Sequence, residues 1–339
     1  MKRLVWKLLF SLFLLGAAYG AYRYWIGLGT AKHTVVYLYS QASAAYLDGD
    51  AVVSSLRRNG MDAAAVQTDD VIGEGIRAIR SGASVLILNE AQPLEGTLLL
   101  ETAERNGTEL LFVGAYPGSD FLMQYDKAYY IGSRTAYAGE LLGRQVAAEY
   151  RSGGLPDQNQ DLILEYLNSD NSGTQASAIY TNLLAECEHY GVYTQSAVSS
   201  VSEDGTAADA ESVDAASVPA EQQISFTDAW ANLAYQPEVI FCPSYDDFIT
   251  SRGYAQTAGW LDAAVPVSFG GYAMSGLQAA QMYQAGCNVV AYYDVDTVSN
   301  VVLQMIMNLA HQDYIAKDTR LSPDENHALW IPSQLYTAP

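Results

Sequence analysis

The chain has 339 residues, half of them hydrophobic, which is enough for two domains with separate cores. Its 38 acidic and 17 basic residues give a net charge of −21, and such a surface repels phosphate backbones, so nucleic acid is excluded as an expected partner. The charge also argues against docking on anionic lipid through a basic patch. The three cysteines, Cys187, Cys242 and Cys287, are too scattered for a disulfide framework or a thiolate zinc site, and we expect them to be small buried hydrophobes.

Residues 1–28 have the composition of an export signal. A basic start over 1–7 precedes an uncharged run over 8–22. Two outcomes stay open. The segment could be cleaved after the small-x-small triplet at 18–20, or it could remain as a membrane anchor over 6–28, which the aromatic residues on both sides of the run favour. The basic start predicts that the rest of the chain is extracytoplasmic, at the cell surface or on the periplasmic side. No cysteine follows the run, which excludes a lipid anchor through cysteine.

Short apolar runs alternate with helical periods along the rest of the chain. The runs read as strands buried on both faces, and they cover 34–39, 84–89, 109–114, 128–132, 161–167, 238–243, 265–270 and 288–293. Helical periods cover 46–59, 71–81, 98–106, 136–150, 174–190, 275–285 and 297–311. This alternation predicts an α/β protein with parallel sheets and helices on both faces, arranged as two similar lobes.

One segment, 196–223, interrupts the alternation. It has six acidic residues and no basic or aromatic one, so it cannot bury enough surface to fold alone, and we expect a flexible acidic insertion. The chain has no GxSxG, HExxH, CxxC or Walker motif, and its four histidines are scattered. Together with the export segment, this pattern favours a binding protein over an enzyme.

The segment at 125–150, YDKAYYIGSRTAYAGELLGRQVAAEY, resembles the one that leads into the second lobe of the galactose/glucose-binding proteins. This is a family of type I periplasmic solute-binding proteins, and segments 82–89, 237–246 and 265–296 agree with it in order and spacing. The resemblance implies two doubly wound parallel-sheet lobes, joined by a hinge with three crossings, and a ligand in the cleft between them. It places lobe 1 at 33–131 and 294–330, lobe 2 at 132–293 and 331–339, and the crossings near Ile131, Tyr293 and Ile331.

An acidic loop follows the helix expected over 136–150. Asp157, Asn159 and Asp161 alternate so that three hard oxygens can turn inward, which is the alternation that a calcium loop needs. The family carries such a loop here, completed by a distant glutamate before a strand. Leu162 stands at the loop's usual glycine, where it would resist a positive φ. The alternative is a polar helix-to-strand loop. The predicted ligands of this structural Ca2+ site are Asp157, Asn159, Asp161, the Ile163 carbonyl, Glu165 and Glu238.

The resemblance also indicates which residues would face the ligand, and most of them differ from those of the family. Ser40 stands at the family's first-strand aspartate, Gly114 at an asparagine and Ser177 at an arginine. Serine cannot replace the planar donor fork of arginine, so we do not expect high-affinity hexose binding in the family's manner. Further equivalent positions are Asn171, Ser244, Tyr272 and Asp294.

Tyrosines and acids are the side chains that replace these contacts. The predicted ligand-binding set is Tyr39, Ser40, Gly114, Tyr116, Asn171, Ser244, Tyr245, Tyr272 and Asp294. Aromatic faces with hydroxyl groups, next to carboxylates, suit an amphiphilic or cationic ligand or a glycoside stacked on the rings. The alternative is that several of these tyrosines only pack at the hinge.

Two functions follow from this reading. The first is a monomeric extracytoplasmic solute-binding protein that delivers a small ligand, such as a carbohydrate, to an ABC transporter permease. The second is a membrane-tethered sensor that reports the ligand to a receptor or histidine kinase. The missing lipid-anchor cysteine favours the second weakly. A hydrolase is disfavoured, because no nucleophile–base pair is evident.

Overall fold

The computed structural model describes residues 33–94, 96–169, 174–198, 230, 233 and 235–337. They form two compact units. The first unit ends at Tyr130 and resumes over Ser299–Ala328, and the second contains Ile131–Val298 and the residues from Leu329 on. The export segment at 1–28 and residues 199–223 of the acidic insertion lie outside the described residues. Within the described ranges, no helix is long and apolar enough to cross a membrane.

The first unit is built on a six-stranded sheet with the order β11-β5-β4-β3-β1-β2. Strand β1 is parallel to both β2 and β3, and β3 is parallel to β4. The chain therefore winds outward in two directions from β1, and the carboxyl ends of β1 and β3 mark the point where the strand order reverses. The strands are β1 (Thr34–Tyr39), β2 (Asp62–Gln67), β3 (Val85–Glu90), β4 (Glu109–Gly114), β5 (Ala128–Gly132) and β11 (Ala328–Trp330).

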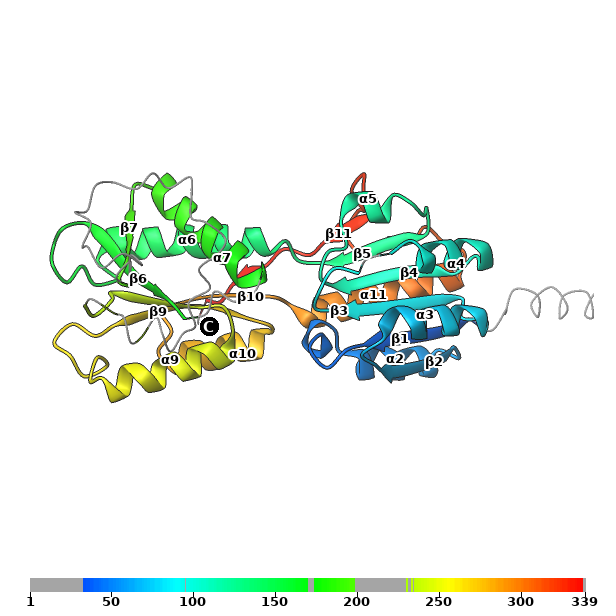
Figure 1. Cartoon of the computed structure of the whole chain (residues 1–339), viewed down its shortest axis with the longest axis horizontal. Coiled ribbons are helices and arrows are strands. Elements are labelled where there is room, and N and C mark those ends of the chain that lie inside the picture. Colours follow the sequence, from blue (N-terminus) through cyan, green and yellow to red (C-terminus); the bar gives the residue numbers. More distant parts are fainter. Residues whose placement is uncertain are drawn as a thin grey trace, which may run out of the picture. The chain divides into compact units, whose positions relative to one another are not determined.

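Helices cover both faces of this sheet (Figure 1), with α3 and α4 on one face and α11 on the other. Side-chain caps fix where two of the helices begin, because Asp48 accepts from the Ala51 N–H before α2 and Asp70 accepts from the Gly73 N–H before α3. The helices are η1 (Ala44–Tyr46), α2 (Gly49–Arg58), α3 (Val71–Arg80), α4 (Leu98–Asn106), α5 (Ser119–Leu122) and α11 (Val295–Ala310).

The second unit repeats this plan with the strand order β12-β10-β9-β8-β6-β7. Strands β6 to β10 pair in parallel, and the short β12 is antiparallel to β10. The strands are β6 (Ile163–Asn168), β7 (Tyr193–Ser196), β8 (Val239–Cys242), β9 (Ser268–Ala273), β10 (Val289–Tyr292) and β12 (Gln334–Leu335).

Helices α6 and α7 lie on one face of the second sheet and α9 and α10 on the other (Figure 1). Glycine lets α6 approach α7 closely, because a Cβ at Gly143 would lie 2.4 Å from the Leu183 carbonyl oxygen. The helices are α6 (Thr135–Ser152), α7 (Thr174–His189), α9 (Tyr245–Thr257) and α10 (Gly276–Gln284).

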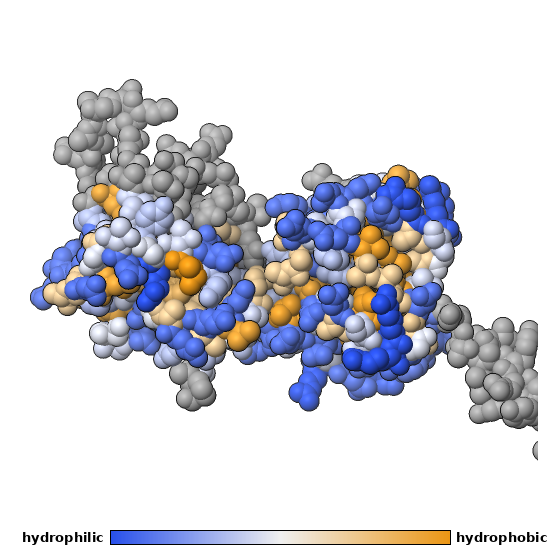
Figure 2. All heavy atoms as spheres, turned by 90° about the horizontal axis from the view of Figure 1, so that it is seen from below, coloured by the Kyte–Doolittle hydropathy of each residue, from blue (hydrophilic) through white to orange (hydrophobic). Residues whose placement is uncertain are grey.

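The three cysteines are buried in the second unit and form no disulfide. Their side chains are at most 2% exposed, and burial raises the pKa of the Cys187 and Cys242 thiols to about 12. Hydrophilic side chains cover most of the face shown in Figure 2, and apolar ones form separate patches on it. The exposed apolar side chains Leu98 and Leu277 lie on different units.

The predicted fold class, two doubly wound α/β lobes, is confirmed. The predicted strand at 265–270 is misplaced, since β9 runs over Ser268–Ala273 and Val265 is 40% exposed. Pro266 lacks a ladder N–H, so the strand begins after it. Strand β2, DAAAVQ, was not predicted, because its three alanines and polar ends give no run of large apolar residues.

Candidate functional site

Four of the predicted ligand residues lie at the carboxyl-end edge of the first sheet, and they are Tyr39, Ser40, Gly114 and Tyr116. Tyr39 ends β1 and pairs in register with Asn89 on β3, and Gly114 ends β4 and pairs with Glu90. Ser40 follows Tyr39 directly. Glu90 therefore lies between Ser40 and Gly114, on the strand that separates them.

The Glu90 carboxylate is tied to the loop after β1. Ser40 Oγ donates to Glu90 Oε2 at 3.1 Å and also lies 3.1 Å from Ser43 Oγ. The fully buried Ser43 donates to the Asn89 carbonyl oxygen at 2.5 Å. Asn89 Nδ2 donates back to the Ser43 carbonyl oxygen and to Tyr37 Oη. This network fixes the loop on the end of β3.

Tyr37 and Tyr39 stack with ring centroids 4.9 Å apart. Tyr37 is buried, and its burial raises the pKa of the phenol to about 12. Tyr39 continues the stack to the strand end and is half-buried. Its ring is therefore the part of the pair closest to the sheet edge.

The backbone of Gly114 packs closely against the backbone of Glu90. Its φ is +89°, and a Cβ there would lie 2.2 Å from the Glu90 carbonyl oxygen, so glycine is required by both conformation and space. Tyr116 follows, with its hydroxyl 2.9 Å from Ser119 Oγ and its ring packed edge-on against Tyr130. The hydroxyl of Tyr130 donates to the Gly114 carbonyl oxygen.

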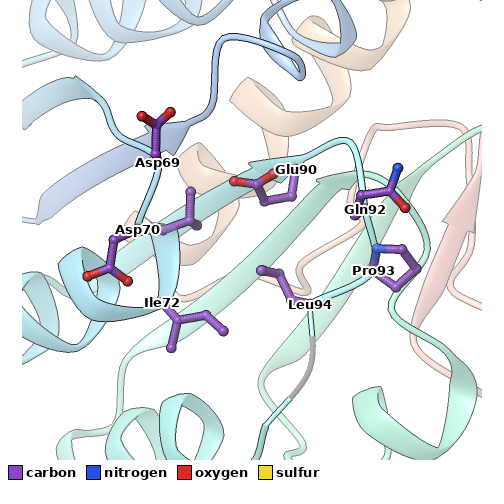
Figure 3. A pocket seen from close by; sticks show the side chains of 8 residues that line it. Asp69, Asp70, Ile72, Glu90, Gln92, Pro93 and Leu94 are labelled. Atoms are coloured by element: carbon purple, nitrogen blue, oxygen red, sulfur yellow. The ribbon is translucent and has the colours of Figure 1, made fainter.

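A pocket of about 240 Å3 opens at this edge (Figure 3). Its acidic lining comes from two elements, with Asp69 and Asp70 before α3 and Glu90 at the end of β3. Val71 and Ile72 from the start of α3, and Gln92, Pro93 and Leu94 from the loop after β3, complete the lining, which has no basic residue. The pocket lies at the reversal point of the strand order, where open α/β sheets bind ligands.

The predicted ligand residues of the second unit have different surroundings. Ser244 caps α9, because its Oγ accepts from the Asp247 N–H, and it lies 2.5 Å from Asp247 Oδ2. Tyr245, half-buried, packs against the hydrophobic core. Tyr272 lies inside β9 rather than at a strand end and is only 2% exposed, so a ligand could touch it only after its ring was uncovered. Asn171 lies outside the described residues.

Asp294 follows β10 and caps α11. Its Oδ1 accepts from the Thr297 N–H at 3.1 Å, and its Oδ2 accepts from Thr297 Oγ1 at 2.7 Å. Both carboxylate oxygens therefore stabilise the start of α11. As a ligand residue, Asp294 stays a prediction.

The acidic loop that leads into β6, residues 157–165, forms a tight turn that is closed by hydrogen bonds to its own side chains. Asp157 Oδ2 accepts from the Leu162 N–H, Asn159 Oδ1 from the Asp161 N–H, and Asp161 Oδ1 from the Ile163 N–H. Leu162 has a φ of +65°, so the turn that usually needs glycine forms with leucine. The expected resistance of Leu162 is overcome by this network of side-chain acceptors.

Glu238 joins this loop to β8. It is fully buried, with Oε1 accepting from the Gln158 N–H and Oε2 from the Glu165 N–H at 3.2 Å. Burial raises the pKa of Glu238 to about 6, with smaller contributions from Asp157 and Glu165, while the two backbone hydrogen bonds oppose the rise. Burial and the nearby Asp161 also raise the pKa of Glu165.

The donors of the loop fit a hard cation in kind. They are carboxylate, amide and carbonyl oxygens, and Asp157 Oδ1 is buried without a hydrogen-bond partner. As the side chains lie, no group of three or more His, Cys, Asp or Glu residues in the described ranges is arranged to hold a metal ion. Carboxylates that now accept backbone N–H groups would have to rotate toward an ion.

Glu90 is the residue at this edge that the sequence reasoning missed. The predicted strand at 84–89 stops at Asn89, whereas β3 includes the next residue, the acid Glu90. An acid at the end of a buried strand is a candidate for ligand contact, because the carboxyl ends of neighbouring parallel strands meet at one edge of the sheet.

No family model matches the chain. Several solved structures have a similar fold. A substrate-binding protein of a sugar ABC transport system from Bordetella parapertussis 12822 is 13% identical, with a TM-score of 0.60, over 91% of this chain and 89% of the other. A periplasmic solute-binding protein from Actinobacillus succinogenes 130z, with bound D-allose, is 11% identical with a TM-score of 0.60, over 90% and 97%. A solute-binding protein from Bacillus halodurans C-125, with bound myo-inositol, is 11% identical with a TM-score of 0.60, over 91% and 96%. The chain therefore has the fold of the type I periplasmic binding proteins.

Proposed function

We propose that this chain is an extracytoplasmic solute-binding protein and not an enzyme, and that it captures a small polyhydroxylated ligand for an ABC importer. The observation that carries the proposal is the edge of the first sheet, where Ser40, Glu90 and Gly114 meet at the reversal point of the strand order. Proteins of the same fold have been solved with bound D-allose and myo-inositol. These ligands are neutral polyols, and a carboxylate acceptor suits their hydroxyl groups.

The side chains at the predicted ligand positions favour a ligand other than the hexoses of the galactose/glucose-binding proteins. Ser177, on α7, offers one hydroxyl where an arginine fork would hold a hexose ring. Tyrosines at strand ends offer apolar faces for the less polar side of a sugar. We therefore expect weak or absent binding of glucose and galactose.

A thermal-shift screen of the purified full-length chain tests the proposal. The probes are D-allose, myo-inositol, L-arabinose, glucose and galactose, each titrated to millimolar concentration. Stabilisation that saturates with at least one polyol supports the proposal, because a ligand that binds only the folded protein raises its stability by mass action. No stabilisation by any of them would overturn it.

The N-terminal segment separates the importer from the sensor alternative. Residues 1–28 carry a basic start and an uncharged run, and the chain has no cysteine there for a lipid anchor. N-terminal sequencing of protein from its own cells distinguishes the two fates. A mature chain that begins at Ala21 in the culture fluid would contradict a membrane-anchored sensor.

We further propose that the loop from Asp157 to Glu165, with Glu238, binds Ca2+ as a structural ion. The alternating oxygens, the Leu162 turn and the unpaired Asp157 Oδ1 support this. An ion there would stabilise the start of β6 and would supply no chemistry to the ligand site.

A further inference from the structure

The edge of the first sheet presents a carboxylate that no aligned family position supplies. We propose that Glu90 is a ligand-binding residue of this protein and that its Oε1 accepts a hydrogen bond from a hydroxyl group of a neutral polyol. The inference rests on the proposed function, because it names a contact within that same ligand site.

The pairing of the strands places Glu90 between predicted ligand residues. Glu90 pairs with Gly114 on one side, and its neighbour Asn89 pairs with Tyr39 on the other. Residues on both sides of Glu90 were expected to contact ligand. A group bound at this edge would reach the end of β3 as readily as the ends of β1 and β4.

A hydrogen bond from Ser40 orients the carboxylate of Glu90. Ser40 Oγ donates to Oε2, which orients the carboxylate, and Oε1 makes no hydrogen bond with the described residues. Glu90 is half-buried and lines the pocket of Figure 3 without a basic residue beside it. A carboxylate held by its neighbours loses little conformational entropy on binding, so a donor on the ligand finds an acceptor already in place.

The space next to Gly114 gives an independent observation. The fully buried Asn89 has a side-chain oxygen, Oδ1, without a hydrogen-bond partner. It lies 3.0 Å from the position that a Cβ at residue 114 would take. Asn89 Oδ1 is covered by the residues around it, so it is an unpaired acceptor directly behind this edge. The acceptor that faces the pocket is the carboxylate of Glu90, which can only accept a hydrogen bond when ionised, so the ligand must donate.

Hydroxyl groups and ammonium groups both donate, and we commit to the hydroxyl. Ser40 Oγ already donates to the carboxylate at 3.1 Å, and Ser43 Oγ lies 3.1 Å from Ser40 Oγ. A ligand hydroxyl would extend this chain of neutral donors.

Calorimetry on the full-length chain tests the inference, with D-allose, myo-inositol and L-arabinose as polyol probes and spermidine as the amine probe. Glu90→Gln keeps the shape of the side chain and removes its charge. Glu104→Gln, on the exposed surface of α4, is the matched control. We expect Glu90→Gln to weaken the bound polyol at least about tenfold, since hydrogen bonds to charged groups are the stronger ones. Glu104→Gln should bind as the wild type does.

Each result decides the matter. Wild-type affinity in Glu90→Gln would overturn the inference and leave the proposed function standing. No binding of any polyol by the wild type would overturn both, and binding of spermidine alone would overturn the choice of hydroxyl. If Glu90→Gln melts well below the wild type, Glu90→Asp replaces it, because it keeps the charge and shortens the side chain by one methylene group. We expect about threefold weaker binding in that variant, and unchanged affinity would overturn the inference.

Discussion

Glu238 and Gln158 are joined across 80 residues of chain by a hydrogen bond of 2.5 Å from the Gln158 backbone N–H to Glu238 Oε1. The second oxygen of Glu238 accepts from the Glu165 N–H. One buried side chain therefore holds both ends of the acidic loop against β8. The loop depends on this contact whether or not it binds an ion.

Glu238→Gln should lower the stability of the protein in the absence of added metal. One of the two backbone N–H groups would face the amide NH2 of glutamine and lose its acceptor, which costs about 1–3 kcal/mol for a buried donor. Urea unfolding measures the difference. Glu165→Gln is the control, because its side chain is half-buried and accepts from the side chains of Asn159 and Tyr235, whereas Glu238 accepts from two backbone N–H groups. An equal loss in both variants would contradict the role assigned to Glu238.

Calcium should raise the melting temperature of the wild type, and a chelator should reverse the rise. A ligand that binds only the folded chain adds about 2.7 kcal/mol at a hundredfold excess over its Kd. Glu238→Gln should abolish the response, because it removes a charged oxygen of the predicted site. The absence of any wild-type response to calcium or chelator would refute the metal proposal.

Leu162→Gly should stabilise the protein. Leu162 has a φ of +65°, which costs a non-glycine residue about 1–2 kcal/mol, and its side chain is 72% exposed, so little packing is lost. Glycine adds about 0.5–1 kcal/mol of unfolded-state entropy cost, which leaves a net gain of about 0.5–1 kcal/mol. Denaturant titration measures the gain, and a less stable variant would contradict the account of the turn.

Gly114→Ala should be strongly destabilising. The new Cβ would meet the Glu90 carbonyl oxygen at 2.2 Å and would sit on a residue with positive φ, which together cost about 2–4 kcal/mol. Gly107→Ala is the control, because Gly107 also has a positive φ but has no atom within 4 Å of its Cβ position. Its cost should be about 1–2 kcal/mol. Similar losses in the two variants would argue against a tight approach at Gly114.

Asp294→Ala and Asp294→Asn should separate capping from ligand binding. Alanine removes the acceptor for the Thr297 N–H and should cost about 0.5–2 kcal/mol, whereas asparagine caps equally well and should leave stability nearly unchanged. If Asp294 binds ligand through its charge, Asp294→Asn should still weaken the polyol about tenfold, or about 1.4 kcal/mol. Unchanged affinity in this variant would restrict Asp294 to the cap.

Periodicity was enough to predict both lobes, because strands such as 109–114 are apolar on both faces and helices such as 98–106 have matching bounds in the structure. The contents of the site were harder to predict. The apolar run at 265–270 predicts a strand that ends before Tyr272, but the strand begins only after Pro266 and contains Tyr272. Glu90 gains its importance from the register with Gly114, which joins positions 24 residues apart, whereas the local sequence shows no more than an acid after an apolar run.

The buried thiols have a practical consequence for measuring ligand binding. Because Cys187, Cys242 and Cys287 are shielded and their pKa values are raised, they should react slowly with maleimides at neutral pH. A single cysteine introduced on the exposed surface could then carry a fluorophore without background labelling. The natural chain is thus already suited to conversion into an optical reporter of its own ligand.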